Sequence, residues 1–202
     1  MTLYDIKPRF QDLLRPLVKR LYNLGVTANQ VTCTATLLSL FCGAMLICFP
    51  HPALFLVLPF FLFLRMALNA VDGMLAREFN QKTSLGAILN ETGDLISDAA
   101  LYLAFAMLPG VSVGLVVGTV LLAWLTEFCG IIAQTLNGQR DYKGPLGKSD
   151  RALLFGTLGL AITLWDGALD YCNAVFWLAS ALSVWTCINR CRAAIGTQSG
   201  RE

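Results

Sequence analysis

Polar and charged side chains recur at helical intervals within residues 65 to 98, a stretch that otherwise consists largely of apolar residues. Two sets share this spacing: Arg65, Asn69 and Asp72 in the first, and Asn90, Asp94 and Asp98 in the second. Intervals of three and four residues place the members of each set on one face of a helix. Ionised groups in an apolar environment are normally paired, bound to a metal or exposed to a water-filled cavity. The spacing therefore indicates a functional site in this stretch.

The two predicted helices run antiparallel through a short loop, so depth can be counted from the loop at about 1.5 Å per residue. The count gives three facing pairs: Asp72 with Asn90, Asn69 with Asp94, and Arg65 with Asp98. Carboxylate and amide oxygens suit a hard divalent cation such as Mg²⁺, Mn²⁺ or Ca²⁺. In the structural alternative these side chains only join two helices, a task usually performed by Ser, Thr or a single Asn.

The deepest pair, Arg65 and Asp98, would be costly if either charge stood alone in a low-dielectric setting. We therefore predict a buried salt bridge that closes the floor of the cavity and fixes the register of the two helices. In the functional alternative Arg65 reaches a substrate phosphate, since guanidinium groups bind phosphate oxygens readily.

The composition identifies the solvent in which these helices must fold. Of 202 residues, 56% are hydrophobic and 14% are charged, with a mean hydropathy of +0.62, whereas a soluble domain carries about 25% charged residues. The sequence predicts an all-α integral membrane protein with one domain over residues 1–202. Residues 27–202 are expected to form a bundle of six transmembrane helices at 28–48, 53–78, 84–108, 111–137, 149–167 and 171–190.

The basic residues indicate how these six helices are oriented. They cluster before the first helix, between the second and third, between the fourth and fifth, and after the sixth, whereas the other three loops contain no Lys or Arg. Because Lys and Arg are retained on the cytoplasmic side, both termini and the entrance of the site are expected to face the cytoplasm.

Residues 1–26 have an amphipathic pattern rather than that of a signal peptide, because charged residues interrupt any apolar core. One helix face is apolar: Ile6, Phe10, Leu13, Leu14, Leu17, Val18 and Leu21. Such a helix either lies in the lipid headgroup layer or packs on the protein's own cytoplasmic face, and the pattern fits both. Thr27 and Gln30 predict a capping box at the start of the first transmembrane helix.

Composition excludes several other chemistries. The single histidine, His51, lies in a loop expected on the side opposite to the site, so no histidine is available there as a catalytic base. The seven cysteines include no C-x-x-C pair and indicate neither a disulfide nor a zinc site. A net charge of +2, with basic residues other than Arg65 in or beside the loops expected on the cytoplasmic side, does not indicate nucleic-acid binding.

The segment NAVDGMLAREFNQKTSLGAILNETGD, residues 69–94, resembles the signature of the CDP-alcohol phosphatidyltransferase family. That signature is D-x-x-D-G-x-x-A-R, followed after eight or nine residues by G-x-x-x-D-x-x-x-D. The matching positions are Asp72, Gly73, Ala76, Arg77, Gly86 and Asp94. The chain departs from the signature at the first and third aspartates, which are Asn69 and Asn90 here.

The resemblance implies transfer of a phosphatidyl group from a CDP-linked lipid such as CDP-diacylglycerol to an alcohol acceptor, with release of CMP. It also implies a bacterial inner-membrane protein and a homodimer. The cation would be Mg²⁺ or Mn²⁺, held at the four aspartate positions of the motif, Asn69, Asp72, Asn90 and Asp94. Asp94 would be the general base. The nucleotide would be bound by Asp72, Gly73, Ala76, Arg77 and Gly86.

Several residues near the motif admit more than one role. Asn69 and Asn90 can ligate a cation but bring no charge, so two metals become one in this interpretation. Glu91 supplies a carboxylate beside Asn90 and is a candidate substrate-binding residue. Gly73 and Ala76 fit close approach of a nucleotide or ordinary helix packing.

Lys148 and Arg151 are candidate ligands of a substrate phosphate at the expected entrance of the fifth helix. They are equally explained as basic residues retained on the cytoplasmic side. Glu127, in the middle of the fourth helix, either joins the polar cavity or pairs locally.

Two functions besides an active transferase remain open on the sequence. A family member that binds a CDP-lipid or headgroup without turnover is favoured by Asn69 and Asn90. A small transporter is disfavoured, because the six predicted helices contain no evident internal repeat and their polar residues gather at one side.

Overall fold

The computed structural model describes residues 3–138, 142–165 and 167–196, for residues 3–8 as backbone only. Of these described residues 86% are helical and none is in a strand. The elements along the chain are α1 Leu3–Asn23, α2 Ala28–Cys48, η1 Pro52–Leu56, α3 Val57–Glu78, α4 Ser84–Leu103, η2 Ala104–Met107, α5 Val113–Asn137, α6 Lys148–Leu164 and α7 Ala168–Gly196. The predicted all-α class is confirmed.

Four helical segments of the described chain are long and apolar enough to cross a membrane, which identifies an integral membrane protein: α2, η1 with α3, α5 and α7. The other two expected spans differ from these for physical reasons. Helix α4 carries the carboxylates of Glu91, Asp94 and Asp98, and α6 is 17 residues long and begins with a charged turn. The six-span count and the orientation of the termini therefore stay predictions.

The boundaries expected from the sequence agree with the helices to within a few residues, except at the end of the chain. Helix α7 extends to Gly196, six residues beyond the expected end. The capping box at the start of α2 is confirmed, since Gln30 N lies 3.3 Å from Thr27 Oγ1 and Thr27 N donates to Gln30 Oε1 at 2.9 Å.

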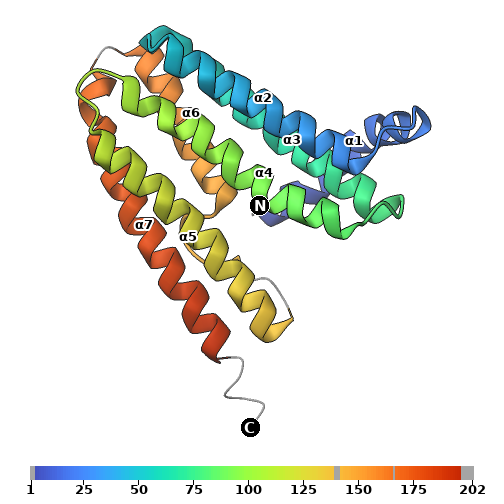
Figure 1. Cartoon of the computed structure of the whole chain (residues 1–202). Helices are drawn as coiled ribbons and strands as arrows, with labels where there is room; N and C mark the ends of the chain where they lie inside the picture. Colours follow the sequence, from blue (N-terminus) through green and yellow to red (C-terminus); the bar gives the residue numbers. More distant parts are fainter. Residues whose placement is uncertain (1–2, 139–141, 166, 197–202) are drawn as a thin grey trace.

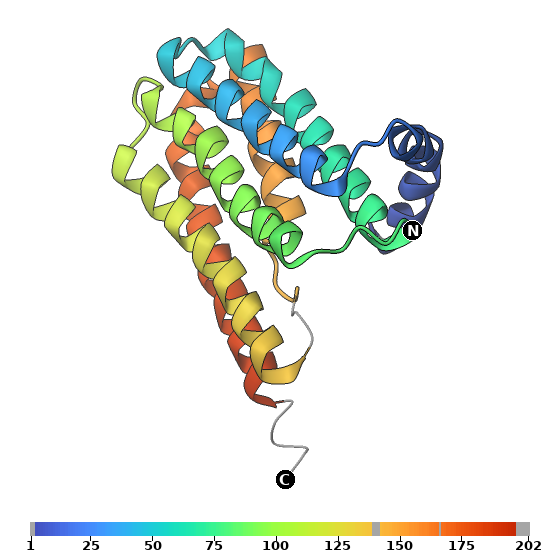
Figure 2. The same ribbon diagram turned by 45° about the vertical axis from the view of Figure 1, so that its right-hand side comes forward.

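The helices form a bundle that opens at one end (Figure 1). Helix α2 packs along α4 and α3, α6 packs on α3, and α5 lies along α7. Figure 2 shows the α5–α7 pair diverging from α2, α3 and α4 towards the end where the chain leaves α7. The residues that line the cavity described below lie between these two arms.

An aromatic cluster holds the bundle together on the side away from that opening. Phe155 of α6 stacks on Phe176 of α7 with ring centroids 5.0 Å apart, and Tyr102 of α4 lies 4.4 Å from Phe155. Phe105 of η2 meets Phe176 at 5.6 Å and Phe55 of η1 at 4.9 Å. All five side chains are buried, and each aromatic pair adds about 0.5 to 1.5 kcal/mol beyond its buried area.

Close approach of α2 and α4 depends on glycine. A Cβ at Gly43 of α2 would overlap the carbonyl oxygen of Ala100 in α4, and a Cβ at Gly93 of α4 would lie 2.6 Å from Thr36 Oγ1 in α2. Small residues allow helix backbones to pack closely where lipid supplies little hydrophobic driving force. This contact fixes the position of α4, which carries most of the polar residues of the motif.

Helix α1 shows features of both interpretations of its apolar face. Val18 is buried, and Leu14 and Leu21 pack with it against α3 and the start of α2. Leu13 and Leu17 stay 75% and 48% exposed, available to a lipid surface. The side chains of Ile6 and Lys7, and the basic residues Arg140 and Arg201, lie outside the described residues.

Candidate functional site

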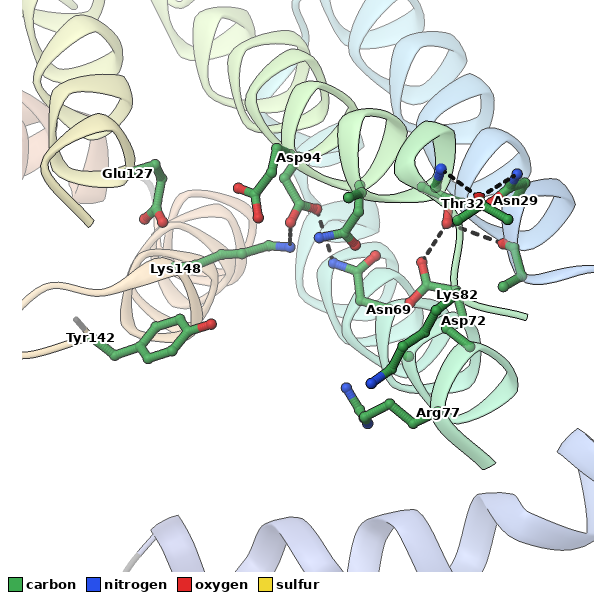
Figure 3. A pocket seen from close by; sticks show the side chains of 18 of the residues that line it. Asn29, Thr32, Asn69, Asp72, Arg77, Lys82, Asp94, Glu127, Tyr142 and Lys148 are labelled. Atoms are coloured by element: carbon green, nitrogen blue, oxygen red, sulfur yellow. Dashed lines mark hydrogen bonds and ion pairs between the residues drawn. The ribbon is translucent and has the colours of Figure 1, made fainter. Parts of the chain in front are cut away.

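A cavity of about 800 Å³ opens between the two arms of the bundle. The ends of α2, α3, α4 and α6 and the two loops α3–α4 and α5–α6 surround it (Figure 3). Ten of the site residues predicted from the sequence line it: Asn69, Asp72, Gly73, Ala76, Arg77, Gly86, Asn90, Glu91, Asp94 and Lys148. The motif residues, 26 positions from first to last, thus meet on one surface.

Asp94 of α4 is a cavity carboxylate with partners on both of its oxygens. Asn69 of α3 donates from Nδ2 to Asp94 Oδ1 at 3.1 Å, and Arg65 Nη2 lies 3.3 Å from the same oxygen. Lys148 of α6 forms an ion pair with Asp94 Oδ2. Figure 3 shows Lys148 reaching Asp94 from one side while Arg77 and Lys82 lie across the cavity. Helices α3 and α6 therefore fix the orientation of this carboxylate.

Asp72 of α3 is held by α2 rather than by its expected partner. Its Oδ2 accepts a 2.7 Å hydrogen bond from the hydroxyl of Thr32, and both side chains are buried. The depth count placed Asp72 level with Asn90, and both line the cavity. The count considered only the α3–α4 hairpin, so it could not find a partner on α2.

Two motif positions are small because neighbouring side chains need the space. A Cβ on Gly73 would lie 3.0 Å from Arg77 Nη2, so the guanidinium group rests against the helix backbone there. A Cβ on Gly86 would lie 2.6 Å from Asn29 Oδ1 of α2. The motif glycines thus position Arg77 and Asn29 on the cavity wall.

The structure brings Arg65 and Asp98 together beneath the cavity. Arg65 Nη1 lies 2.6 Å from Asp98 Oδ1, and each residue is 3% exposed. Arg65 also donates from Nη2 to the backbone carbonyl of Asp94 at 3.0 Å. The pair therefore supports the deeper end of the site and joins α3 to α4.

A continuous series of ion pairs extends from this point across the bundle. Asp98 Oδ2 lies 3.5 Å from Arg151 Nη2 of α6, which lies 2.9 Å from Glu127 Oε1 of α5. Glu127 Oε2 in turn lies 3.6 Å from Arg190 Nη1 of α7. Because charges of opposite sign alternate along the series, each buried charge has a partner, as a low-dielectric interior requires.

Arg151 does not lie where the sequence analysis expected it. The expectation was a substrate-binding residue at the entrance, but Arg151 is 1% exposed and does not line the cavity. Its guanidinium donates to Thr126 Oγ1 at 3.0 Å and to the Leu146 carbonyl at 3.2 Å. Lys148 and Arg151 share a helix face. Because Arg151 lies about one turn further into α6, its side chain lies inside the bundle rather than at the cavity.

Sequence reasoning missed residues that act through tertiary contacts. Arg190 was attributed to topology alone, yet it is 1% exposed, pairs with Glu127 and donates to the backbone carbonyl of Thr126. The isolated buried Glu127 was the signal that a basic partner had to exist. Thr32, in contrast, carries no signal that distinguishes it from other threonines of α2.

The oxygen donors fit one divalent cation better than two. No group of three or more His, Cys, Asp or Glu side chains suited to a metal occurs among the described residues. Asp72, Asn69 and Asn90 line the cavity and together offer one carboxylate and two amide oxygens for a hard cation. Asp94 has both carboxylate oxygens in ion pairs.

The fold and the motif residues on the cavity wall define a class of protein. A model of the CDP-alcohol phosphatidyltransferase family matches residues 25–185. The chain belongs to this family of membrane enzymes of phospholipid biosynthesis, as the motif predicted. The transporter alternative has no support from this assignment.

Relatives and solved structures agree with the family. The chain is similar to "Inner membrane protein YnbA" of Escherichia coli strain K12, with 56% identity over 195 residues, 96% of this chain and 97% of the relative. The phosphatidylinositol phosphate synthase of Mycobacterium marinum is 30% identical over 196 residues, 90% of this chain and 79% of the synthase.

Two crystal structures of the Mycobacterium tuberculosis phosphatidylinositol phosphate synthase share the fold. The structure with CDP-DAG bound has a TM-score of 0.73 and 23% identity, covering 89% of this chain and 92% of the synthase. The structure in complex with manganese and citrate has a TM-score of 0.73 and 22% identity, covering 89% and 87%.

Proposed function

We propose that this protein transfers a phosphatidyl group from CDP-diacylglycerol, or a related CDP-linked lipid, to an alcohol, with release of CMP. The observation that carries the proposal is the cavity in which all six matching motif residues meet, with Asp94 19% exposed to it. The M. tuberculosis structure with CDP-DAG bound, which has the same fold, supports the choice of donor.

Basic residues on two sides of the cavity and a cation site would together bind the donor. Arg77 and Lys82 provide positive charge for the donor phosphates on one side, and Lys148 provides it on the other. Gly73 keeps the surface beside Arg77 free of a side chain. A divalent cation, Mg²⁺ or Mn²⁺, held by Asp72, Asn69 and Asn90 would neutralise phosphate charge and polarise the phosphorus.

We propose Asp94 as the general base. The hydroxyl oxygen of the acceptor attacks the lipid-linked phosphorus while its proton passes to the Asp94 carboxylate. The bond between that phosphorus and the oxygen of the CMP phosphate breaks, and CMP leaves with the bonding electrons. Asn69 and Arg65 hold Oδ1 of Asp94, so Oδ2 is the oxygen that faces the acceptor once Lys148 turns to a phosphate.

We further propose that six helices, α2 to α7, cross the bacterial inner membrane as one domain and that the cavity opens to the cytoplasm. The cavity is framed by the α3–α4 and α5–α6 loops, which carry basic residues typical of the cytoplasmic side. Helix α1 would lie at the membrane surface through Leu13 and Leu17. A homodimer remains a prediction of the family resemblance.

A second candidate function is binding of a CDP-lipid without turnover. It is favoured by Asn69 and Asn90 at aspartate positions of the motif and by the ion pair of Lys148 with Asp94, which engages the proposed base. Both functions use the same cavity and differ only in whether the phosphorus–oxygen bond breaks.

The decisive assay incubates the purified full chain with CDP-diacylglycerol, Mg²⁺ or Mn²⁺, and a panel of free and phosphorylated polyols, and measures CMP. An active transferase releases CMP only when donor, cation and the correct alcohol are all present. Tight CDP-diacylglycerol binding with no CMP from any acceptor would contradict turnover and leave the binding function.

A further inference from the structure

The ion pair between Lys148 and Asp94 differs in exposure from the buried ion pairs below the cavity. Lys148 is 29% exposed and the Asp94 side chain 19%, so this pair faces the cavity. Arg65 and Arg151, in contrast, are 3% and 1% exposed and pair with Asp98 below the cavity. An ammonium group on the cavity wall is accessible to a ligand, whereas the deeper guanidinium groups are buried in ion pairs that join helices.

The charges around the cavity suggest what the ammonium group does. Asn69 and Asn90 remove two negative charges relative to the aspartate motif that the chain otherwise matches. Asn69 also directs its amide nitrogen to Asp94, so it serves that carboxylate as a donor. A second divalent cation next to Asp94 would lie against the Lys148 ammonium with one carboxylate to offset its charge. Repulsion at such short range opposes its binding.

We infer that Lys148 takes the place of a second divalent cation in this cavity. Its ammonium group supplies the positive charge beside Asp94, and the site holds one divalent cation, on the side of Asp72. The role inferred for this charge, neutralisation of the donor phosphates, rests on the proposed function. The test below does not, because it measures metal binding without substrate.

The side chain of Lys148 can reach both the Asp94 carboxylate and a donor phosphate. Lysine carries its charge on a flexible four-carbon chain, so it can turn from a carboxylate to a phosphate without movement of the helix backbone. Lys148 is the first residue of α6, and its α-carbon is fixed by the capping contact of Asp150 Oδ2 with the backbone nitrogen of Gly147 at 2.9 Å. Asp94 orients the ammonium group until the donor arrives.

The test counts Mn²⁺ ions bound by the purified full chain, using electron paramagnetic resonance of free Mn²⁺ and no substrate. Wild type is expected to bind one Mn²⁺ per chain. The variant Asn69→Asp with Asn90→Asp is expected to bind that one ion more tightly. Adding Lys148→Met to these two changes should create a second site, tighter than any second binding in the Lys148 background by about tenfold or more.

Two controls isolate the charge at this position. Lys148→Arg in the same two-aspartate background keeps the charge and should keep one Mn²⁺ per chain. Lys82→Met removes a different ammonium group from the cavity wall and should also leave the count at one. Each protein is checked for a cooperative thermal transition before the count.

Two Mn²⁺ ions bound by wild type, or one ion bound by the two-aspartate Lys148→Met variant, would overturn the inference. An equal gain from Lys82→Met would show that the effect is not specific to Lys148 and would overturn it too. Failure of the proposed function would appear separately, as no CMP from wild type in the transfer assay.

Discussion

Asp94 is the residue on which the charges of the cavity converge. Its two oxygens meet Arg65, Asn69 and Lys148, which come from two other helices. A general base must be held in one orientation and remain reachable from the substrate side. The contacts of Oδ1 with Asn69 and Arg65 satisfy the first condition for the proposed base, and Oδ2, whose partner Lys148 lies on the cavity wall, satisfies the second once Lys148 turns to a phosphate.

Asp72 is positioned in a similar way by a hydroxyl group of a neighbouring helix, that of Thr32. Removing the hydroxyl in Thr32→Val leaves a buried carboxylate without its 2.7 Å donor, which should lower the free energy of unfolding by about 1.5 to 3 kcal/mol. Thermal unfolding in detergent measures the change. Thr34→Val, an exposed position on the same helix, is the matched control and should change stability little. Equal transitions for both variants would show that the Thr32 contact contributes nothing.

Residue spacing predicted much of this site and missed a defined part of it. The intervals in α3 and α4 identified the pairs Asn69–Asp94 and Arg65–Asp98, which are in contact. They did not identify Thr32, because a helix pattern carries no information about which neighbour packs on it. The position of Arg151 near a loop also led to a wrong prediction, because distance from a loop does not tell which way a side chain on the first turn of a helix points.

At the scale of elements, α3 and α4 are joined by a buried ion pair rather than by apolar packing alone. Arg65 and Asp98 lie one turn below the Asn69–Asp94 contact, so their register sets the position of the proposed base. Gly43 and Gly93 allow α2 to approach α4 from the other side. The hairpin is therefore held at the depth of the site on two sides.

Replacing one partner of the Arg65–Asp98 pair should lower stability more than replacing both partners together. Arg65→Met and Asp98→Leu each remove the closest partner of a buried charge and leave a longer contact, 3.5 Å from Asp98 to Arg151 or 3.3 Å from Arg65 to Asp94. Each should therefore destabilise the ligand-free protein by about 3 kcal/mol, the lower end of the cost of breaking a buried pair. The double variant should recover much of that loss, while the Arg151–Glu127 contact remains. A double-mutant cycle of thermal stability makes the comparison.

The opposite pattern would assign Arg65 to the substrate. If each single variant were as stable as wild type, and Arg65→Met alone weakened CDP-lipid binding, the structural role of the pair would be wrong. Binding of CDP-diacylglycerol to the three variants separates the two roles.

At the scale of the whole molecule, the arms of the bundle diverge where the polar residues gather. The α5–α7 pair leaves the α2–α3–α4 layer at one end (Figure 2). Aromatic contacts join α4, α6 and α7 elsewhere in the bundle. Composition predicted the helical class and the membrane setting, because both follow from total hydropathy and spacing. The divergence was not predictable, since it depends on which helices pack together.

The proposed topology places the α3–α4 and α5–α6 loops on the cytoplasmic side. In a cysteine-free background, Lys82→Cys and Ser149→Cys should react with a membrane-impermeant thiol reagent only after the cytoplasmic side is made accessible. His51→Cys, in the loop before η1, should react from the outside in intact cells. Labelling of His51→Cys and Lys82→Cys from the same side would contradict the orientation.

The central claim is that Asp94 takes a proton from an alcohol during phosphatidyl transfer, and CMP release by Asp94→Asn tests it most directly. The variant keeps the size of the side chain but is not a base, so the rate should fall by at least about 100-fold, the contribution typical of a positioned base. CDP-diacylglycerol binding should persist, which verifies the fold. Glu78→Gln, which removes a carboxylate paired with Arg15 outside the cavity, should keep the wild-type rate. CMP release by Asp94→Asn at the wild-type rate would contradict the assignment of the base.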